Sequence, residues 1–207
     1  MADRVPLDFD PPARQLRSLL LGIDETELIA PTPCADWSVA ALLVHLLGVC
    51  AAFTQAARKL TGSPGTAGPP PPPLAADLPA YWRSRMPVLI EELATAWRDP
   101  AAWTGTAQVG GGTMPAAMIG AFGMNELVMH SWDLAQATGQ DYAADPRILE
   151  ALIELLAQGA PLFGEVVEIE PESALLDQAV ALAGRDPQWR SARREQGFSR
   201  RSTAVVE

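Results

Sequence analysis

Two side chains that can bind a metal ion stand four residues apart in an otherwise apolar stretch, Glu126 and His130 within residues 114–139. This spacing places both on one face of an α-helix, one turn apart. The same predicted face carries mostly small or apolar residues: Ile119, Phe122, Gly123, Leu127, Leu134 and Ala137. Because a buried carboxylate or imidazole is costly without a compensating partner, we expect a polar site in the interior here.

The other histidine of the chain supplies a candidate partner. The sequence holds two histidines, and His45 is the one polar residue of the run VAALLVHLLGVCAAF at 39–53. Two neutral imidazoles and one carboxylate form a three-ligand set for zinc or a similar divalent ion, with a position left open for water or substrate. We therefore predict a metal site made of His45, Glu126 and His130. Zinc is the first expectation, with nickel, manganese and iron as alternatives.

Two other interpretations of this cluster stay open. The three side chains could form a buried hydrogen-bonded network without a metal. Two histidines and one carboxylate are also the ligand set of non-haem iron oxygenases, although a helical E-x3-H pattern without strands around it argues against that class.

Four neighbouring residues have a functional and a structural interpretation. Asp133 either fixes the orientation of a ligand imidazole, which metal-binding histidines generally need, or serves as a salt-bridge or helix-end charge. Cys34 lies near the start of a predicted helix, where a thiolate is favoured, but a small buried residue is the more common role. Trp132 is expected to pack between helices. Trp37 is expected to fix the angle at which the chain enters the helix at residue 39.

Composition and periodicity predict an all-α protein. Apolar residues make up 48% of the 207-residue chain, and the long apolar segments repeat at three and four residues rather than at two. A chain of this length fits one domain. We expect helices at 13–22, 39–59, 78–98, from 113 or 114 to Gly139, at 146–158 and at 171–183. Ser38 is the expected N-cap of the second of these.

Three segments lie outside the predicted helices. The stretch TGSPGTAGPPPPP at 61–73 predicts an extended linker. Three glycines at 110–112 predict a turn or short hairpin near the mouth of the site. From Arg185 onward the chain holds six of its fifteen basic residues and no apolar period. We expect the bundle to span residues 1–187 and a disordered basic tail to span 188–207.

Charge and hydropathy exclude several functions. A net charge of −10 argues against a nucleic-acid partner, because phosphate neutralisation needs clustered cations. The longest apolar run has fifteen residues and a histidine inside it, so no membrane span is expected. Acidic residues and prolines near the start do not resemble a secretory signal, and Cys34 and Cys50 are too few for a disulfide framework. We therefore expect a cytoplasmic protein.

Several motifs together resemble a known family. They are TPCADWSVAALLVHLLG at 32–48, AAWTGTAQVGGGTMPAA at 101–117, NELVMHSWDLAQATG at 125–139, APLFGEVVEIEP at 160–171 and ALAGRDP at 181–187. They resemble DinB-like bundle proteins. More closely, they resemble the metal-binding domain of mycothiol-dependent maleylpyruvate isomerase and its single-domain relatives in high-G+C bacteria. The paired pattern W-S/T-V-x5-H with E-x3-H-x-W-D is the most specific part.

The resemblance implies a DinB-like four-helix bundle, here with additional short C-terminal helices. It also implies a divalent metal held by His45, Glu126 and His130, and in some members thiol-dependent transfer or isomerisation. It further implies that the isomerase has a C-terminal domain without a counterpart in this chain.

The expected function is metal-dependent thiol S-transfer or isomerisation. The partners would be a low-molecular-weight thiol such as mycothiol and a small electrophile. A bound cation deprotonates a thiol, and the sequence offers no second glutamate placed as the base that hydrolysis would need. A metal-dependent hydrolase and a non-catalytic metal- or ligand-binding bundle remain the alternatives. Bundles of this type often pair through helix faces, so a homodimer is one candidate assembly.

Overall fold

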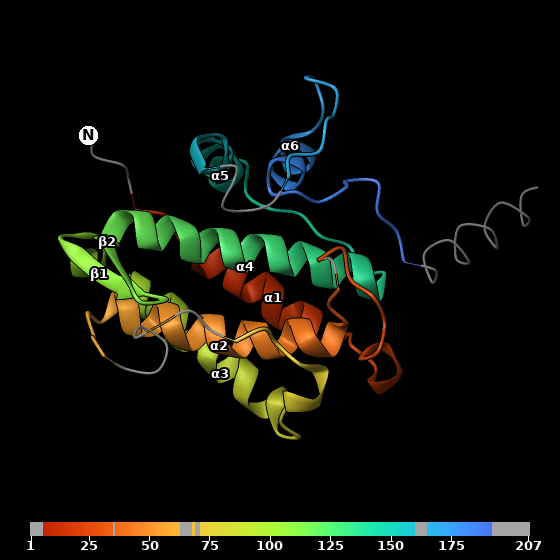
Figure 1. Ribbon diagram of the computed structural model, residues 1–207, viewed down its shortest axis with the longest axis horizontal. Coiled ribbons are helices and arrows are strands. Elements are labelled where there is room, and N and C mark those ends of the chain that lie inside the picture. Colours follow the sequence, from red (N-terminus) through yellow and green to blue (C-terminus); the bar gives the residue numbers. More distant parts are fainter. Residues whose placement is uncertain (1–5, 35, 63–67, 69–70, 160–164, 192–207) are drawn as a thin grey trace, which may run out of the picture.

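Four long helices form a bundle in the computed structural model, which describes residues 6–34, 36–62, 68, 71–159 and 165–191 (Figure 1). They are α1 (Asp10–Leu21), α2 (Val39–Ala57), α3 (Trp82–Trp97) and α4 (Ala116–Thr138). Helix α2 packs against both α3 and α4, and α1 packs against α3 and α4 on the other side. The prediction of an all-α four-helix bundle is confirmed.

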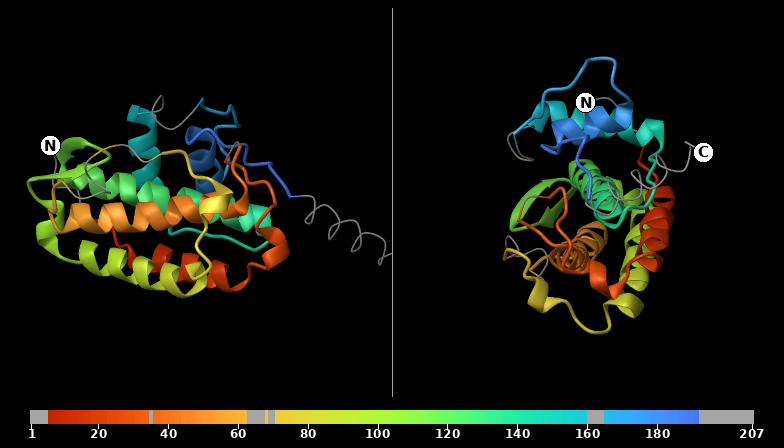
Figure 2. Two further views of the ribbon diagram at one scale, coloured as in Figure 1. Left: turned by 60° about the horizontal axis from the view of Figure 1, so that its bottom comes forward. Right: turned by 90° about the vertical axis from the view of Figure 1, so that its right-hand side faces the viewer.

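Two shorter helices form a second layer. Helices α5 (Pro146–Gly159) and α6 (Leu175–Leu182) pack on each other, and α5 also contacts α4. They lie on the side of α4 that faces away from α2 and α3 (Figure 2). The expected additional C-terminal helices are therefore present, and α4 is covered from two sides.

Helix α2 owes its central position to its apolar surface. By length and composition alone it could cross a membrane, but 61% of its most apolar window is buried inside the protein. A helix that is apolar nearly all round belongs in the middle of a bundle. The Oγ atom of Ser38 accepts a hydrogen bond from the backbone N–H of Ala41 at 3.3 Å, which confirms the predicted N-cap.

The start of α4 differs from the prediction because a hairpin precedes it. Strands β1 (Thr106–Val109) and β2 (Gly112–Pro115) pair in antiparallel register. Gly110 and Gly111 turn the chain between them with φ angles of 58° and 83°, a region that favours glycine. The residue before a proline is driven towards extended backbone. Met114 therefore continues the strand, and the helix starts after Pro115.

The same effect shortens another helix. Leu78 stands before a proline and is extended, with ψ of 112°, so α3 begins at Trp82 rather than at residue 78. Helix α2 ends two residues early, since Lys59 has a left-handed φ of 57°. Gly139, with φ of 68°, ends α4 as predicted. Short 3₁₀ turns lie at Glu25–Glu27, Ala75–Asp77 and Pro100–Trp103.

The predicted linker and tail are described only in part. Residues 63–67 and 69–70 of the linker lie outside the described residues, and so do residues 192–207 of the expected tail. Within the described part, Trp189 packs against the hydrophobic core. The boundary between bundle and tail at residue 187 stays a prediction.

One end of the bundle is closed by aromatic rings that approach α4 closely. Phe9 stacks on Trp97 with 5.6 Å between ring centroids, and Trp103 meets Trp97 edge-on at 4.8 Å. A Cβ atom at Gly120 would lie 2.5 Å from a Trp103 ring carbon and 2.8 Å from one of Trp97. The absent side chain of Gly120 is thus a packing requirement.

We expect Gly120→Ala to lower the free energy of unfolding by about 1–3 kcal/mol, because two packed indole rings must move. Urea denaturation would measure it. Gly48→Ala is the matched control, since a Cβ there meets nothing within 4 Å. It should leave stability unchanged or raise it by up to about 1 kcal/mol through helix propensity. Equal losses in both variants would contradict this account.

Candidate metal centre

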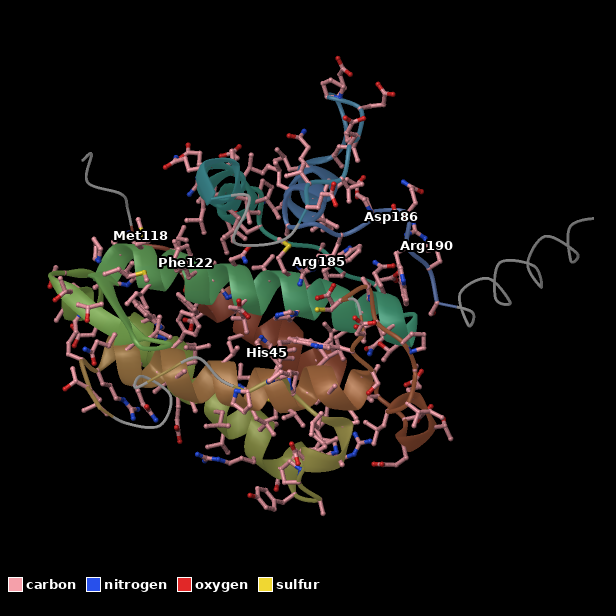
Figure 3. All side chains as sticks on the ribbon, viewed as in Figure 1. His45, Met118, Phe122, Arg185, Asp186 and Arg190 are labelled. Atoms are coloured by element: carbon pink, nitrogen blue, oxygen red, sulfur yellow. The ribbon has the colours of Figure 1, made fainter. Side chains whose placement is uncertain are left out.

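The three predicted ligands meet between α2 and α4. The Nε2 atom of His45 lies 2.9 Å from Oε2 of Glu126, and the Nε2 atom of His130 lies 3.2 Å from the same oxygen. These three atoms all lie within 4.8 Å of one another. Figure 3 shows His45 in the space between the two helices. The structure therefore brings together one side chain from α2 and two from α4.

The donor set fits a divalent ion. Ligand atoms at about 2.1 Å from a tetrahedral ion are about 3.4 Å apart, which is close to the separations between Glu126 and the two imidazoles. The Nδ1 atom of His130 is occupied by a hydrogen bond with Asp133, so its Nε2 atom is the one that faces the cluster. Small shifts would let all three side chains coordinate one ion.

The electrostatics of the cluster favour charged groups. Burial alone would raise the pKa of Glu126, but hydrogen bonds to His130 and His45 hold it well below its ordinary value. Burial alone would lower the pKa of His130. Its hydrogen bonds with Asp133 and Glu126 outweigh that effect and raise the pKa to about 9. The glutamate is therefore an anion ready to act as a ligand, and a bound cation would take the place of the imidazole proton.

Asp133 fixes the orientation of His130. Its Oδ2 atom lies 2.9 Å from Nδ1 of the imidazole, and its side chain is fully buried. Arg185 approaches the two carboxylate oxygens of Asp133 at 3.3 and 3.1 Å and donates to the carbonyl of Ala183 at 2.7 Å. Both roles considered for Asp133, holding an imidazole and pairing with a cation, occur in this geometry.

Arg185 was not predicted as part of the site. It stands just after α6, more than fifty residues from Asp133 in sequence, and reaches α4 from the second layer (Figure 3). A partial signal was available, because an aspartate on the buried face of a helix needs a compensating partner. Ten of the fifteen basic residues precede residue 188, so the sequence alone does not select Arg185.

Trp37 forms one wall of the site. Its ring centroid lies 4.8 Å from that of His45 and 5.8 Å from that of His130. This contact goes beyond the predicted role of fixing the entry of α2, because the indole restricts both candidate ligands. Trp132 is buried in the core, as expected for a residue that packs between helices.

The two cysteines differ in position. Cys34 lies with His130 and Asp133 in a second group whose ligand atoms are within 4.8 Å of one another. Burial, and then the negative charge of Asp133, raises the pKa of the Cys34 thiol to about 11. The interpretation favoured from the sequence, a small buried residue rather than a nucleophile, is consistent with this raised pKa. Cys50 is in the core as predicted, and both cysteines are free.

A cleft of about 570 Å³ opens beside the cluster. His45 and Glu126 line it, and their side chains are 16% and 26% exposed. Val109 and Gly110 of the hairpin line the same cleft, so the predicted hairpin lies beside the candidate site. The cluster is thus reachable by a small molecule.

Fold and site together define a class of protein. This protein is a DinB-like helical bundle with two histidines and a glutamate between α2 and α4. The family described as mycothiol maleylpyruvate isomerase N-terminal domain matches residues 9–135. The chain belongs to this family. The match contains His45, Glu126, His130 and Asp133, but it ends before Arg185.

Sequence relatives share most of the chain. Two uncharacterized proteins from two strains of Mycobacterium tuberculosis are each 28% identical to it over 147 residues. The alignment covers 71% of this chain and 72% of each relative.

Solved structures show the same fold. A crystal structure of the mycothiol-dependent maleylpyruvate isomerase aligns with a TM-score of 0.60 at 17% identity, covering 87% of this chain and 88% of that one. A mutant of that isomerase with a histidine replaced by alanine aligns with a TM-score of 0.55, again at 17% identity, over 80% and 75% of the two chains. Most of the first isomerase chain therefore has a structural counterpart here, contrary to the expected missing domain.

We expect Asp133→Asn to lower the free energy of unfolding by about 3 kcal/mol, because it leaves Arg185 buried without its counter-charge. Chemical denaturation would measure it. Asp186→Asn is the control. Asp186 is exposed and caps the backbone N–H of Gln188, which asparagine also does. A loss for Asp133→Asn no larger than for the control would show that the pair contributes nothing to stability.

Metal titration separates the two groups of candidate ligands. We expect wild-type protein to bind about one zinc ion per chain, and His45→Ala and Glu126→Gln to lose it while remaining folded. Cys34→Ser should retain the ion, because Cys34 is absent from the His45 group. Atomic emission after dialysis measures the content. Loss of zinc in Cys34→Ser with retention in His45→Ala would place the ion at the other group.

Proposed function

We propose that this protein is a metal-dependent enzyme that transfers or isomerises a small electrophile with a low-molecular-weight thiol such as mycothiol. The observation that carries the proposal is the meeting of His45, Glu126 and His130, two of which, His45 and Glu126, line an open cleft. Membership of the mycothiol maleylpyruvate isomerase N-terminal domain family makes mycothiol the first thiol to test. A reduced thiol also fits the cytoplasmic location expected from the sequence.

Each residue of the site has a defined task in this proposal. His45, Glu126 and His130 would hold a divalent ion, most simply zinc. Asp133 accepts a hydrogen bond from the Nδ1–H group of His130 and so keeps the Nε2 atom of that imidazole directed at the ion. Trp37 covers one side of both imidazoles and limits access of water from that side.

The ion would supply one chemical property, a lower pKa for a thiol held beside it. A thiol deprotonated in this way would need no separate protein side chain as a base. The Cys34 thiol is unsuited to act as the nucleophile, since its pKa is raised to about 11. An external thiol is thus the better source of sulfur.

The test uses zinc-loaded protein with mycothiol and follows either consumption of the thiol by monochlorobimane or conversion of maleylpyruvate to its isomer, a reaction that returns the thiol. We expect thiol-dependent turnover that falls by at least about 100-fold in Glu126→Gln, the scale on which loss of a catalytic metal acts. Removal of zinc by a chelator should have the same effect, and added zinc should restore the rate. Asp186→Asn serves as the control for handling and folding.

Two outcomes would replace the proposal. Turnover of esters or amides without thiol would identify a hydrolase. Stoichiometric zinc without any turnover would leave a metal-binding bundle.

A further inference from the structure

The cleft beside the candidate ligands has mainly apolar walls. Helix α2 contributes Val44, Val49 and Phe53, the linker contributes the three prolines at 71–73, and the hairpin contributes Val109. These walls lead directly to His45 and Glu126. A molecule that reaches the cluster from this side must leave most of its water behind.

No lysine or arginine lines this cleft among the residues that the structure describes, and its charged side chains are Asp77 and Glu126. The sequence of residues 63–67 and 69–70 contains no charged residue. Arg185 is paired with Asp133, and Lys59 donates to the carbonyls of Ala102 and Thr104. The described walls therefore offer a negatively charged ligand no counter-charge.

The chemistry of the walls selects among ligands. A carboxylate that loses its water in apolar surroundings pays a large desolvation cost unless a cation compensates it. Glu126 and a thiolate together would balance the two charges of a divalent ion, so the ion adds little attraction for a second anion. A sugar-bearing thiol such as mycothiol needs hydrogen-bond partners that these walls supply sparsely. A neutral apolar molecule meets neither difficulty.

Gly48 contributes no side chain to the lining of the cleft. It lies three residues after His45, on the same side of α2, and lines the cleft. A Cβ atom there would meet nothing within 4 Å, so no close contact between helices requires glycine. Glycine inside a helix costs about 0.5–1 kcal/mol relative to alanine. The absent side chain offsets this cost with one visible effect, which is free space in the cleft beside His45.

We infer that this cleft receives a neutral, apolar electrophile, and that Gly48 determines which electrophiles fit. The inference rests on the proposed function for its reaction and on the cleft alone for its binding preference. In the simplest reaction, with an aryl chloride, a sulfur–carbon bond forms and the carbon–chlorine bond breaks. Chloride leaves with the bonding electron pair, and the proton of the thiol passes to water.

Binding is tested with two unreactive compounds that differ by one carboxylate, 1,3-dinitrobenzene and 3,5-dinitrobenzoate. Equilibrium dialysis is carried out on the zinc-loaded full chain with mycothiol present, since neither compound carries a chloride to displace and nitro groups meta to each other activate displacement of nitrite only weakly. We expect the neutral compound to bind at least about tenfold more tightly, because the carboxylate must be desolvated without a partner. Equal affinities, or a preference for the carboxylate, would overturn the inference.

Two substitutions of similar length test the role of Gly48. Gly48→Lys brings a cation into the cleft and should shift the preference towards 3,5-dinitrobenzoate by at least about tenfold. Gly48→Met fills the same space without charge and should weaken both compounds alike. Both residues are better helix formers than glycine, and circular dichroism checks the fold. An unchanged preference in Gly48→Lys would show that the cleft is not where these compounds bind.

Turnover separates this inference from the proposed function. The reactive pair is 1-chloro-2,6-dinitrobenzene and 4-chloro-3,5-dinitrobenzoate, which again differ by one carboxylate. Faster thiol consumption with the neutral compound supports both proposals. Faster consumption with the carboxylate compound overturns the substrate class and leaves the thiol transferase standing. Preferential binding of the neutral compound without thiol consumption overturns the transferase and leaves the binding preference standing.

Discussion

The structure of the site depends on His130 standing between two carboxylates. Glu126 faces one ring nitrogen and Asp133 the other, and both acids are on the same helix as the histidine. An imidazole in this position would lose its charge through burial, yet its pKa is raised. Positive charge is therefore strongly favoured at this point of the interior. Either a proton on the imidazole or a metal ion can supply this charge. A metal ion can therefore bind at the cluster by replacing the proton.

This demand for charge explains how α2 and α4 are paired. Both helices are long and largely apolar, and many relative rotations would bury their surfaces equally well. Only rotations that bring His45 to Glu126 satisfy the buried polar groups. The hydrophobic effect holds the helices together, while the polar contact selects one register. The cleft lies beside the same contact, and Gly48 and Gly110 contribute no side chains to its lining.

Much of this was predictable from periodicity. The apolar repeats located all six helices, and E-x3-H in an apolar helix pointed to a buried polar site. The starts of α3 and α4 were placed too early because proline rules act on the preceding residue, Leu78 or Met114, and helical periodicity does not register them. The tilt of Trp37 over the imidazoles and the pairing of Arg185 with Asp133 depend on how the segments fold back in three dimensions. No local pattern contains that information, although a buried aspartate indicates that a cation from elsewhere in the chain pairs with it.

Arg185 also bears on what the second layer is for. The matched family domain spans residues 9–135, and Asp133, almost at its end, takes its counter-charge from a residue fifty positions beyond it. The domain that carries the candidate ligands is thus not electrostatically self-sufficient. Arg185, which follows α6, supplies the positive charge that Asp133 needs, so a buried ion pair joins the second layer to the bundle. A chain that kept the ligands and exchanged this layer would have to find another cation for the same buried acid.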